Sequence, residues 1–242
     1  DYFHPGGAAL TDRTIHAMAM QAGERIADLG CGSGSSGLTL ASEHHLQVIA
    51  VDLNQSNLDY AAARARHLGL SLVDEIQGLD TLNGQGGLCF IQADVSCLPI
   101  ADASLDGALC ECTLSLFPHQ AKTLKEINRC LKPGGRLGVT DMAVAGSLAP
   151  ELLSVIGPWA CLNGALSESG YLDMFSQAGF SVQEHADESQ SLIDLLEGLK
   201  RRLLVLAAGQ SLGMVQHPNM PKLDMAQVKH YLERARDEIV AG

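Results

Sequence analysis

The chain has 242 residues, 46% of them hydrophobic, with 28 acidic side chains against 16 lysines and arginines and a formal net charge of -12. This length allows one buried α/β core with an appendage. The acidic balance argues against a nucleic-acid backbone or an anionic membrane as partner. No apolar run reaches the ~18 residues of a membrane span.

The seven cysteines form no C-x-x-C pair and lie in apolar segments. A chain of this size does not depend on disulfides, so reduced thiols in a cytoplasm are expected. No metal is expected either. The chain begins at Asp1 rather than at methionine, which leaves a longer gene product open.

Helices and strands alternate over the first part of the chain. Apolar residues at helical spacing predict a helix over 10–23, with Thr11 and Asp12 as candidate caps. The glycine-rich segment 70–87 is longer than a usual connection and is interpreted as a surface excursion. Strands are predicted at 25–30, 47–53, 88–94, 104–111 and 136–142, and helices at 35–44, 56–69 (with Ser56 as cap) and 119–135.

The rest of the chain is predicted to be helical, apart from one candidate strand at 181–186. The helices are expected over 148–165, 168–180, 189–209 and from Asp224 onward. We therefore predict an α/β fold with a doubly wound, mostly parallel sheet and helical additions at both ends. The predicted organisation is an N-terminal helical lid (1–22), a central domain (23–186) and a C-terminal helical extension (187–242) through which a homodimer is expected.

The segment "DLGCGSGSSGLTLA" (28–41) permits two interpretations. Gly32, Gly34 and Gly37 fit the G-x-G-x-x-G spacing of a dinucleotide site. The carboxylate of Asp28, however, would repel a pyrophosphate at a helix N-terminus. It favours a ligand that is cationic there, such as the amino group and sulfonium of S-adenosylmethionine.

Two further aspartates are predicted at the carboxyl ends of strands, where ligands bind in open α/β sheets. Asp52 follows the glycines by about 20 residues and is placed to accept the ribose hydroxyl hydrogens, which both ligand classes possess. Asp94 would take the adenine amino group while Val95 packs on the ring. Asp94 therefore also favours S-adenosylmethionine.

Four ordered motifs resemble those of class I S-adenosylmethionine-dependent methyltransferases: "IADLGCGSGSSGLTLA", "VIAVDLNQSNLDYA", "FIQADVSCLPIADASLDGALCE" and "CLKPGGRL". The resemblance covers about residues 24–142 and implies S-adenosylmethionine as cofactor. It implies that the methionine part faces Asp28, Gly30, Cys31, Gly32 and Gly34, that ribose and adenine are held by Asp52, Leu53, Asn57, Asp94 and Val95, and that Cys110 and Glu111 line the sulfonium side.

The region 110–180 resembles arsenite methyltransferases, in which two cysteines bind trivalent arsenic. The matching positions are Cys112 and Cys161, and soft arsenic prefers thiolates. No convincing third thiol is found in the N-terminal segment, and Cys31 and Cys97 are the nearby alternatives. The opposing interpretation is that both cysteines are small core residues.

A small-molecule methyltransferase is therefore predicted, with a thiophilic substrate as one alternative. A carbon, oxygen or nitrogen acceptor is another, and an oxygen or nitrogen acceptor would need a base. His4, His119 and His185 are candidates for it, and His4 also belongs to "HPGG" (4–7), a predicted lid segment. A non-catalytic cofactor-binding or assembly protein is the third alternative.

Overall fold

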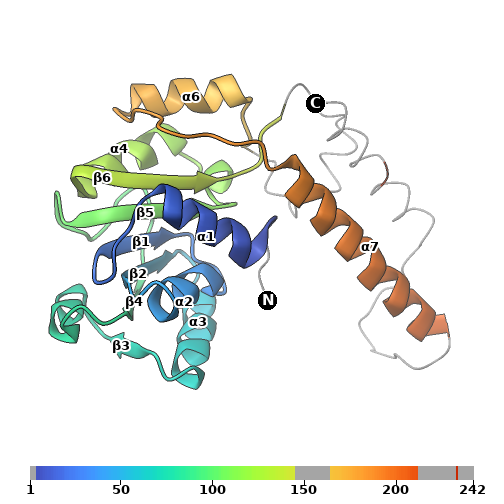
Figure 1. The fold of residues 1–242 in the computed structure, drawn as a ribbon, viewed down its shortest axis with the longest axis horizontal. Helices are drawn as coiled ribbons and strands as arrows, with labels where there is room; N and C mark the ends of the chain where they lie inside the picture. Colours follow the sequence, from blue (N-terminus) through green and yellow to red (C-terminus); the bar gives the residue numbers. More distant parts are fainter. Residues whose placement is uncertain (1–3, 145–163, 212–232, 234–242) are drawn as a thin grey trace.

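The computed structural model describes residues 4–144, 164–211 and 233. Its centre is one parallel sheet of six strands in the order β3-β4-β2-β1-β5-β6 (Figure 1). The strands are β1 (Arg25–Leu29), β2 (Gln47–Asp52), β3 (Ser71–Val73), β4 (Gly87–Gln92), β5 (Leu105–Glu111) and β6 (Leu131–Thr140). The prediction of a doubly wound sheet is confirmed, and the chain changes direction across the sheet between β1 and β5.

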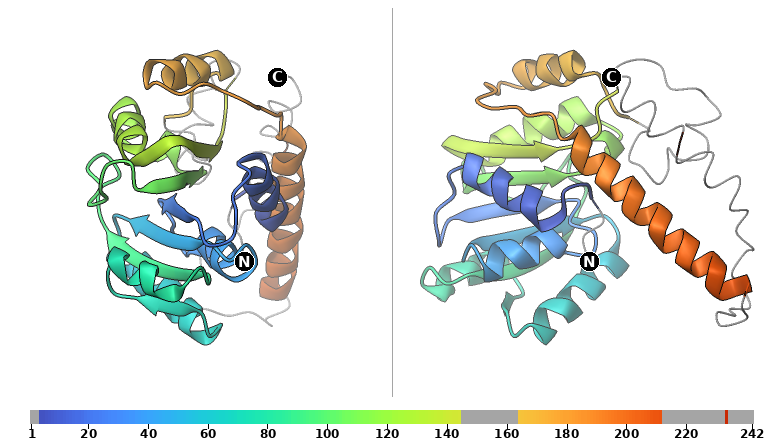
Figure 2. Two further views of the ribbon diagram at one scale, coloured as in Figure 1. Left: turned by 60° about the vertical axis from the view of Figure 1, so that its left-hand side comes forward. Right: turned by 45° about the vertical axis from the view of Figure 1, so that its right-hand side comes forward.

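Helices cover both faces of the sheet, which explains why the strands are apolar throughout. One face carries α1 (Gly7–Ala17), α2 (Ser35–Ser42) and α3 (Gln55–His67), and the other carries α4 (Gln120–Cys130) and α6 (Glu168–Gln177) (Figures 1 and 2). Alternate strand residues enter the two cores. Ile26 and Leu109 pack on the α1–α3 face, whereas Ala27, Ala108 and Cys110 pack on the α4 and α6 face.

Helix α1 differs from its prediction at both ends. It spans Gly7–Ala17, and its N-cap is Gly6 in the left-handed conformation, so the predicted caps Thr11 and Asp12 are wrong. Thr11 lies one turn inside the helix with its side chain fully buried. Ile15 and Met18 are buried in the core of the α1–α3 face, so α1 is packed firmly on the sheet. Helix α3 likewise begins earlier than predicted, because Asn54 rather than Ser56 caps it.

The segment 70–87 is not only a surface excursion. It contains the edge strand β3 and the 3-10 helix η1 (Ile76–Leu82), whose Leu79 is fully buried. The strand predicted at 181–186 is also wrong, because these residues are exposed and unpaired with the sheet. The helix predicted over 119–135 ends at Cys130, because Leu131 already pairs with Leu105 in the sheet.

Helix α7 (Ser189–Ser211) begins near the carboxyl end of β6 and runs obliquely away from the sheet (Figures 1 and 2). An ion pair of 2.7 Å between Arg13 of α1 and Glu188 ties its start to the domain. None of the described helices combines the length and the apolar character needed to cross a bilayer. The predicted helices over 148–165 and from Asp224 lie outside the described residues. The three-part domain division stays a prediction.

Candidate functional site

The turn between β1 and α2 needs glycine for two different reasons. Gly30 and Gly34 have φ values of 74° and 76°, in the region that side chains rarely adopt. A Cβ at Gly30 would lie 2.9 Å from Cγ2 of Thr113, and one at Gly34 would lie 2.6 Å from Cβ of Ala61. A Cβ at Gly32 would meet nothing within 4 Å. The turn is therefore packed against the protein at Gly30 and Gly34. It is open at Gly32, where a ligand can approach the backbone.

Two carboxylates lie beside this turn, at the point where the strand order reverses. Asp28 of β1 is 3% exposed and Glu111, the last residue of β5, is 8% exposed. Asp28 is in register with Leu109, so both carboxylates point to the α1–α3 face of the sheet. The first turn of α2 satisfies both: the Gly37 N–H donates to Asp28 at 3.0 Å, and the Ser36 hydroxyl donates to Glu111.

This arrangement excludes the dinucleotide interpretation of the glycine spacing. In a dinucleotide site the helix N-terminus faces the pyrophosphate. Here the N-terminus of α2 already faces two carboxylates of the protein itself. Gly37 completes the fingerprint for a packing reason, because a Cβ there would lie 3.0 Å from Oδ2 of Asp28. The site has the electrostatics of a cation site.

The carboxyl group of Asp28 titrates far from its ordinary range. Burial, followed by the negative charges of Glu111 and Asp52, raises its pKa from 3.8 to about 7, and the hydrogen bond from the Gly37 N–H opposes this rise. A positively charged neighbour would stabilise the ionised form of such a buried carboxyl group. Shifts of this size mark functional sites more often than structural ones.

The N-terminal residues close over Glu111. The Thr11 hydroxyl of α1 lies 3.1 Å from each carboxylate oxygen of Glu111, and Nε2 of the buried His4 lies 3.6 Å from Oε2. The predicted lid segment "HPGG" thus reaches the carboxylate at the end of β5. Thr11 and Ser36 are site residues that the sequence did not predict. For Thr11 the sequence holds a usable signal: a threonine on the buried face of a helix needs a polar partner in the core.

Asp52 orients its carboxylate toward the glycine turn. Its Oδ2 accepts from the Gly32 N–H at 2.9 Å, and its Oδ1 accepts from the Asn54 N–H at 2.8 Å and from Nδ2 of Asn57 at 3.2 Å. The next residue, Leu53, is 70% exposed although it is apolar. A fixed carboxylate beside an exposed apolar side chain fits a ribose and its attached base.

The third strand end contributes Asp94, which is exposed after β4. Its pKa lies below the ordinary value, mainly because the Ser96 N–H donates to it at 2.8 Å. Val95 is only 8% exposed and packs in the core under the sheet. The carboxylate is therefore accessible, whereas the packing of Val95 on adenine stays a prediction.

These donors and acceptors suit S-adenosylmethionine. Asp52, Leu53 and Asp94 lie along one edge of the sheet, and the backbone of Gly32 is open to a ligand. Asp28 and Glu111 supply negative charge at the other end of this edge. Among the described residues His4 is the only basic side chain within 4 Å of either carboxylate, so a cationic ligand is favoured there.

Four of the cysteines lie in the glycine turn or in the core. Cys31 lies in the glycine turn, and burial together with the charge of Asp28 raises the pKa of its thiol, so it is not a reactive thiolate. Cys110 is fully buried on the opposite face from Glu111, so of this pair only Glu111 points to the α1–α3 face, toward Thr11 and Ser36. Cys89 and Cys130 are core residues, as predicted.

Cys112 is the predicted substrate thiol that the structure describes. It lies just beyond β5 with φ of 52°, is half-buried, and its N–H donates to the Thr140 carbonyl at 2.7 Å. The strand ends at Glu111, so the strand alternation that would place Cys112 on the side of Cys110 does not apply. Cys161 lies outside the described residues.

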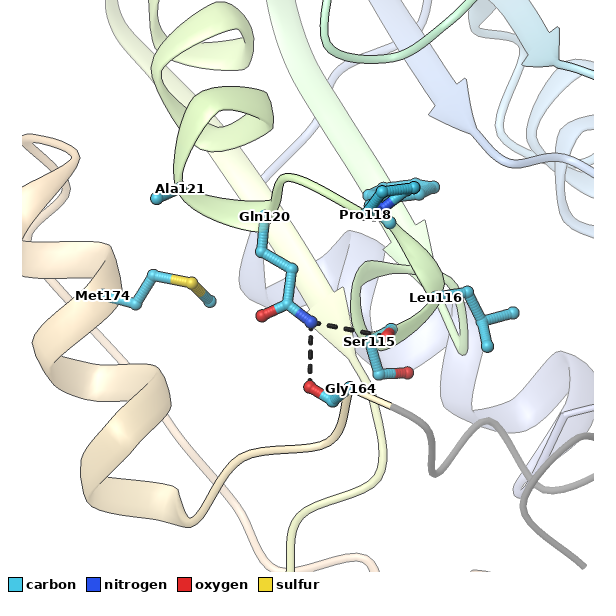
Figure 3. Close-up of a pocket in the computed structure, with 8 residues that line it drawn as sticks. Ser115, Leu116, Pro118, Gln120, Ala121, Gly164 and Met174 are labelled. Carbon is cyan, nitrogen blue, oxygen red and sulfur yellow. Dashed lines mark hydrogen bonds between the residues drawn. The ribbon is translucent and has the colours of Figure 1, made fainter. Parts of the chain in front are cut away.

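A hollow of about 480 Å³ opens next to the carboxyl ends of β5 and β6, between the start of α4 and α6 (Figure 3). Gln120 spans it, with Nε2 donating to the carbonyls of Ser115 and Gly164 at 3.4 and 2.8 Å. The half-buried carboxylate of Asp141 accepts from both the N–H and the hydroxyl of Ser115, which fixes the wall. The lining residues are Ser115, Leu116, Phe117, Pro118, Gln120, Ala121, Gly164 and Met174.

The three candidate histidines occupy different places. His119 is exposed immediately before α4, at the edge of this region, whereas His4 is buried against Glu111. His185 is exposed and pairs with Glu168 at 3.2 Å. Only His4 and His119 lie near the carboxyl edge of the sheet.

The fold and the acidic side chains at its strand ends are those of a class I methyltransferase domain. Residues 27–139 match the family described as the methyltransferase domain. The predicted class is therefore confirmed: the chain carries an S-adenosylmethionine-dependent methyltransferase domain, and S-adenosylmethionine is the cofactor of that class.

The curated relatives are also methyltransferases. The chain is 27% identical to the methyltransferase GfsG of Streptomyces halstedii over 187 residues, covering 76% of this chain and 62% of that protein. It is 27% identical to the O-methyltransferase resE of Aspergillus sclerotiorum (78% and 67% covered) and 26% identical to the 27-O-demethylrifamycin SV methyltransferase of Amycolatopsis mediterranei (81% and 70% covered). The match thus covers 62% of the length of GfsG and 67% of the length of resE.

Solved structures share the fold. A phosphoethanolamine N-methyltransferase of Haemonchus contortus, in complex with S-adenosylhomocysteine, superposes with a TM-score of 0.71 at 18% identity, over 99% of this chain and 50% of that one.

Among the sequence relatives, an arsenite methyltransferase of Halobacterium salinarum is 26% identical over 176 residues, covering 72% of this chain and 41% of that protein. This similarity does not single out arsenic as the substrate.

Proposed function

We propose that this chain transfers the methyl group of S-adenosylmethionine to a hydroxyl oxygen of a small organic molecule. The observation that carries the proposal is the pair Asp28 and Glu111, which occupies the N-terminus of α2 and leaves a site for a cation. The hydroxyl acceptor is supported by the names of relatives that methylate oxygen.

When bound, S-adenosylmethionine supplies an electrophilic methyl group on a cationic sulfur. Asp52 and Asp94 would hold its ribose and adenine, and the open backbone at Gly32 would receive the methionine part. The carboxylates of Asp28 and Glu111 would fix the cationic end by charge. Methyl transfer depends on such positioning and on exclusion of water more than on a strong acid.

The acceptor would lie in the hollow beside Ser115 and Gln120. Leu116 and Met174 give this open hollow apolar surface. The acceptor hydroxyl would have to give up its proton on methylation, because the bonding electron pair of the donor's carbon–sulfur bond would stay on the sulfur. His119, at the edge of this region, is the candidate base.

Turnover of labelled S-adenosylmethionine with a panel of small alcohols and phenols tests this proposal. We expect label transfer to at least one hydroxyl compound, with His119→Asn lowering kcat by about 10²-fold or more and leaving cofactor affinity within about twofold. His67→Asn, on the far end of α3, is the matched control. Transfer to amines or thiols alone would contradict the hydroxyl assignment.

A thiophilic acceptor such as trivalent arsenic is the second candidate, because Cys112 is half-buried at the carboxyl end of β5. The panel should therefore include arsenite. Arsenite methylation that Cys112→Ser and Cys161→Ser abolish, with hydroxyl compounds inactive, would replace the first candidate. Unchanged activity in both variants would leave the two thiols with a packing role.

A further inference from the structure

The amide group of Gln120 has a fixed orientation in the hollow between α4 and α6. Its Nε2 donates to the carbonyls of Ser115 and Gly164 at 3.4 and 2.8 Å. Both partners are acceptors, so the amide nitrogen must face them and the amide oxygen must face away. Figure 3 shows this oxygen on the side of Met174, which also lines the hollow. The side chain therefore presents a hydrogen-bond acceptor to the hollow.

The two residues that hold this amide are themselves fixed. Ser115 donates its N–H and its hydroxyl to the carboxylate of Asp141, at 2.8 and 2.7 Å. Gly164 leaves room for the amide, because a Cβ there would lie 2.7 Å from Nε2 of Gln120 and would clash with the Ser115 carbonyl oxygen. Any side chain at position 164 would therefore displace Gln120. The position of the amide oxygen is set by the surrounding backbone rather than by a free rotamer choice.

The oxygen of Gln120 has unused capacity to accept hydrogen bonds. An amide oxygen has two lone pairs, and no residue in the described part of the chain donates to this one. Its surroundings in the hollow include the apolar side chains of Leu116 and Met174. A molecule that covers the oxygen without donating to it displaces water and leaves the oxygen unpaired, which costs free energy. The hollow therefore favours a ligand that carries a hydrogen-bond donor.

We propose that Gln120 determines specificity for the methyl acceptor: its amide oxygen selects molecules that carry a second hydrogen-bond donor besides the hydroxyl group that is methylated. This inference rests on the proposed function, because it takes the hollow as the acceptor site. A second hydroxyl group donates to the oxygen, whereas a methoxy group at the same place has no hydrogen to donate. The substrate class is thereby narrowed from hydroxyl compounds in general to diols and diphenols.

Rates of methyl transfer to matched pairs of acceptors test the proposal. The pairs are catechol, resorcinol, hydroquinone and 1,4-butanediol, each with its monomethyl ether, so that the members of a pair differ in one donor. For the wild-type protein we expect kcat/KM to be about tenfold higher for the dihydroxy compound in at least one pair, the order of one hydrogen bond. Two equivalent hydroxyl groups alone would give a ratio of about two by counting the reactive groups.

Gln120→Met keeps the length of the side chain but removes its acceptor, so it should reduce this ratio to about two. Gln85→Met changes an exposed glutamine at the amino end of β4 and should keep the wild-type ratio. If Gln120→Met does not fold, Gln120→Lys decides by the same ratio, since lysine can donate to the two carbonyls and has no acceptor atom.

A ratio near two in the wild-type protein for every accepted pair would overturn the proposal. A preference for the dihydroxy compounds that survives in the Gln120 variant would overturn it as well, because another group would then accept the hydrogen bond. Transfer to no compound of the panel would instead contradict the proposed function itself.

Discussion

Asp28 shows how a single residue reveals the character of the site. It is buried beside Glu111 and accepts one hydrogen bond from Gly37, which does not offset the cost of its charge. Stability is therefore lost at this position, in the place where a cationic ligand would recover it. Residues retained at such a cost are commonly functional.

Asp28 should lower the stability of the ligand-free protein as the pH rises. Its pKa of about 7 exceeds the value of 3.8 in the unfolded chain, so the folded state binds more protons between these values. Below about pH 4 the protonated Asp28 makes its full contribution to the free energy of unfolding. This contribution falls by up to about 4 kcal/mol as the pH rises through 7. Urea unfolding of Asp28→Asn should therefore show a gain over wild type at pH 8 that disappears near pH 4.

Asp59→Asn, an exposed aspartate on α3, should show no such pH-dependent gain. A gain for Asp28→Asn that is equal at pH 4 and pH 8 would contradict the raised pKa of Asp28.

Among the elements, the packing of α2 on α3 depends on Gly34, the N-cap of α2. Its φ of 76° disfavours a side chain, and a Cβ at this position would lie only 2.6 Å from Cβ of Ala61. We expect Gly34→Ala to lower the free energy of unfolding by about 3 kcal/mol, which combines left-handed strain with overpacking. Urea denaturation measures this loss.

The matched control is Gly69→Ala, at the end of α3. Gly69 has φ of 70° but a Cβ there would meet nothing within 4 Å. Only the left-handed strain applies, about 1 kcal/mol. Equal losses in the two variants would show that the contact between Gly34 and Ala61 adds nothing.

The sequence predicted the elements of the sheet better than their ends. Strands β1, β2, β4 and β5 follow apolar runs, so their positions could be read directly. The end of α4 could not, because β6 starts at Leu131 through pairing with Leu105, a contact between residues far apart in the chain. The short edge strand β3 was missed for the same reason, since Ser71–Val73 pair with β4.

The sequence predicted the residues of the candidate site at the strand ends but missed those contributed by helices. Asp28, Asp52 and Asp94 could be placed because parallel strands end at one edge of a sheet. Thr11 and Ser36 could not, since their bonds to Glu111 join α1, α2 and β5 across the fold. Cys110 and Glu111 lie on opposite faces because side chains alternate along a strand, whereas the motif resemblance assigned both to the same side of the cofactor.

At the scale of the whole molecule, the methyltransferase domain forms one continuous sheet with α1 included in its core. Helix α7 leaves this domain after the ion pair of Glu188 with Arg13. The expected homodimer through the helical extensions stays a prediction, and sedimentation equilibrium would measure it.

The central claim is that the carboxyl ends of β1, β2, β4 and β5 hold S-adenosylmethionine rather than a dinucleotide. Calorimetric titration of S-adenosylmethionine and of NAD into the wild-type protein and Asp52→Ala, with Asp59→Ala as control, tests it most directly. We predict that S-adenosylmethionine binds, that Asp52→Ala weakens it by at least about tenfold because charge-assisted hydrogen bonds are lost, and that NAD does not bind. Binding of NAD with the same dependence on Asp52, and none of S-adenosylmethionine, would contradict the account.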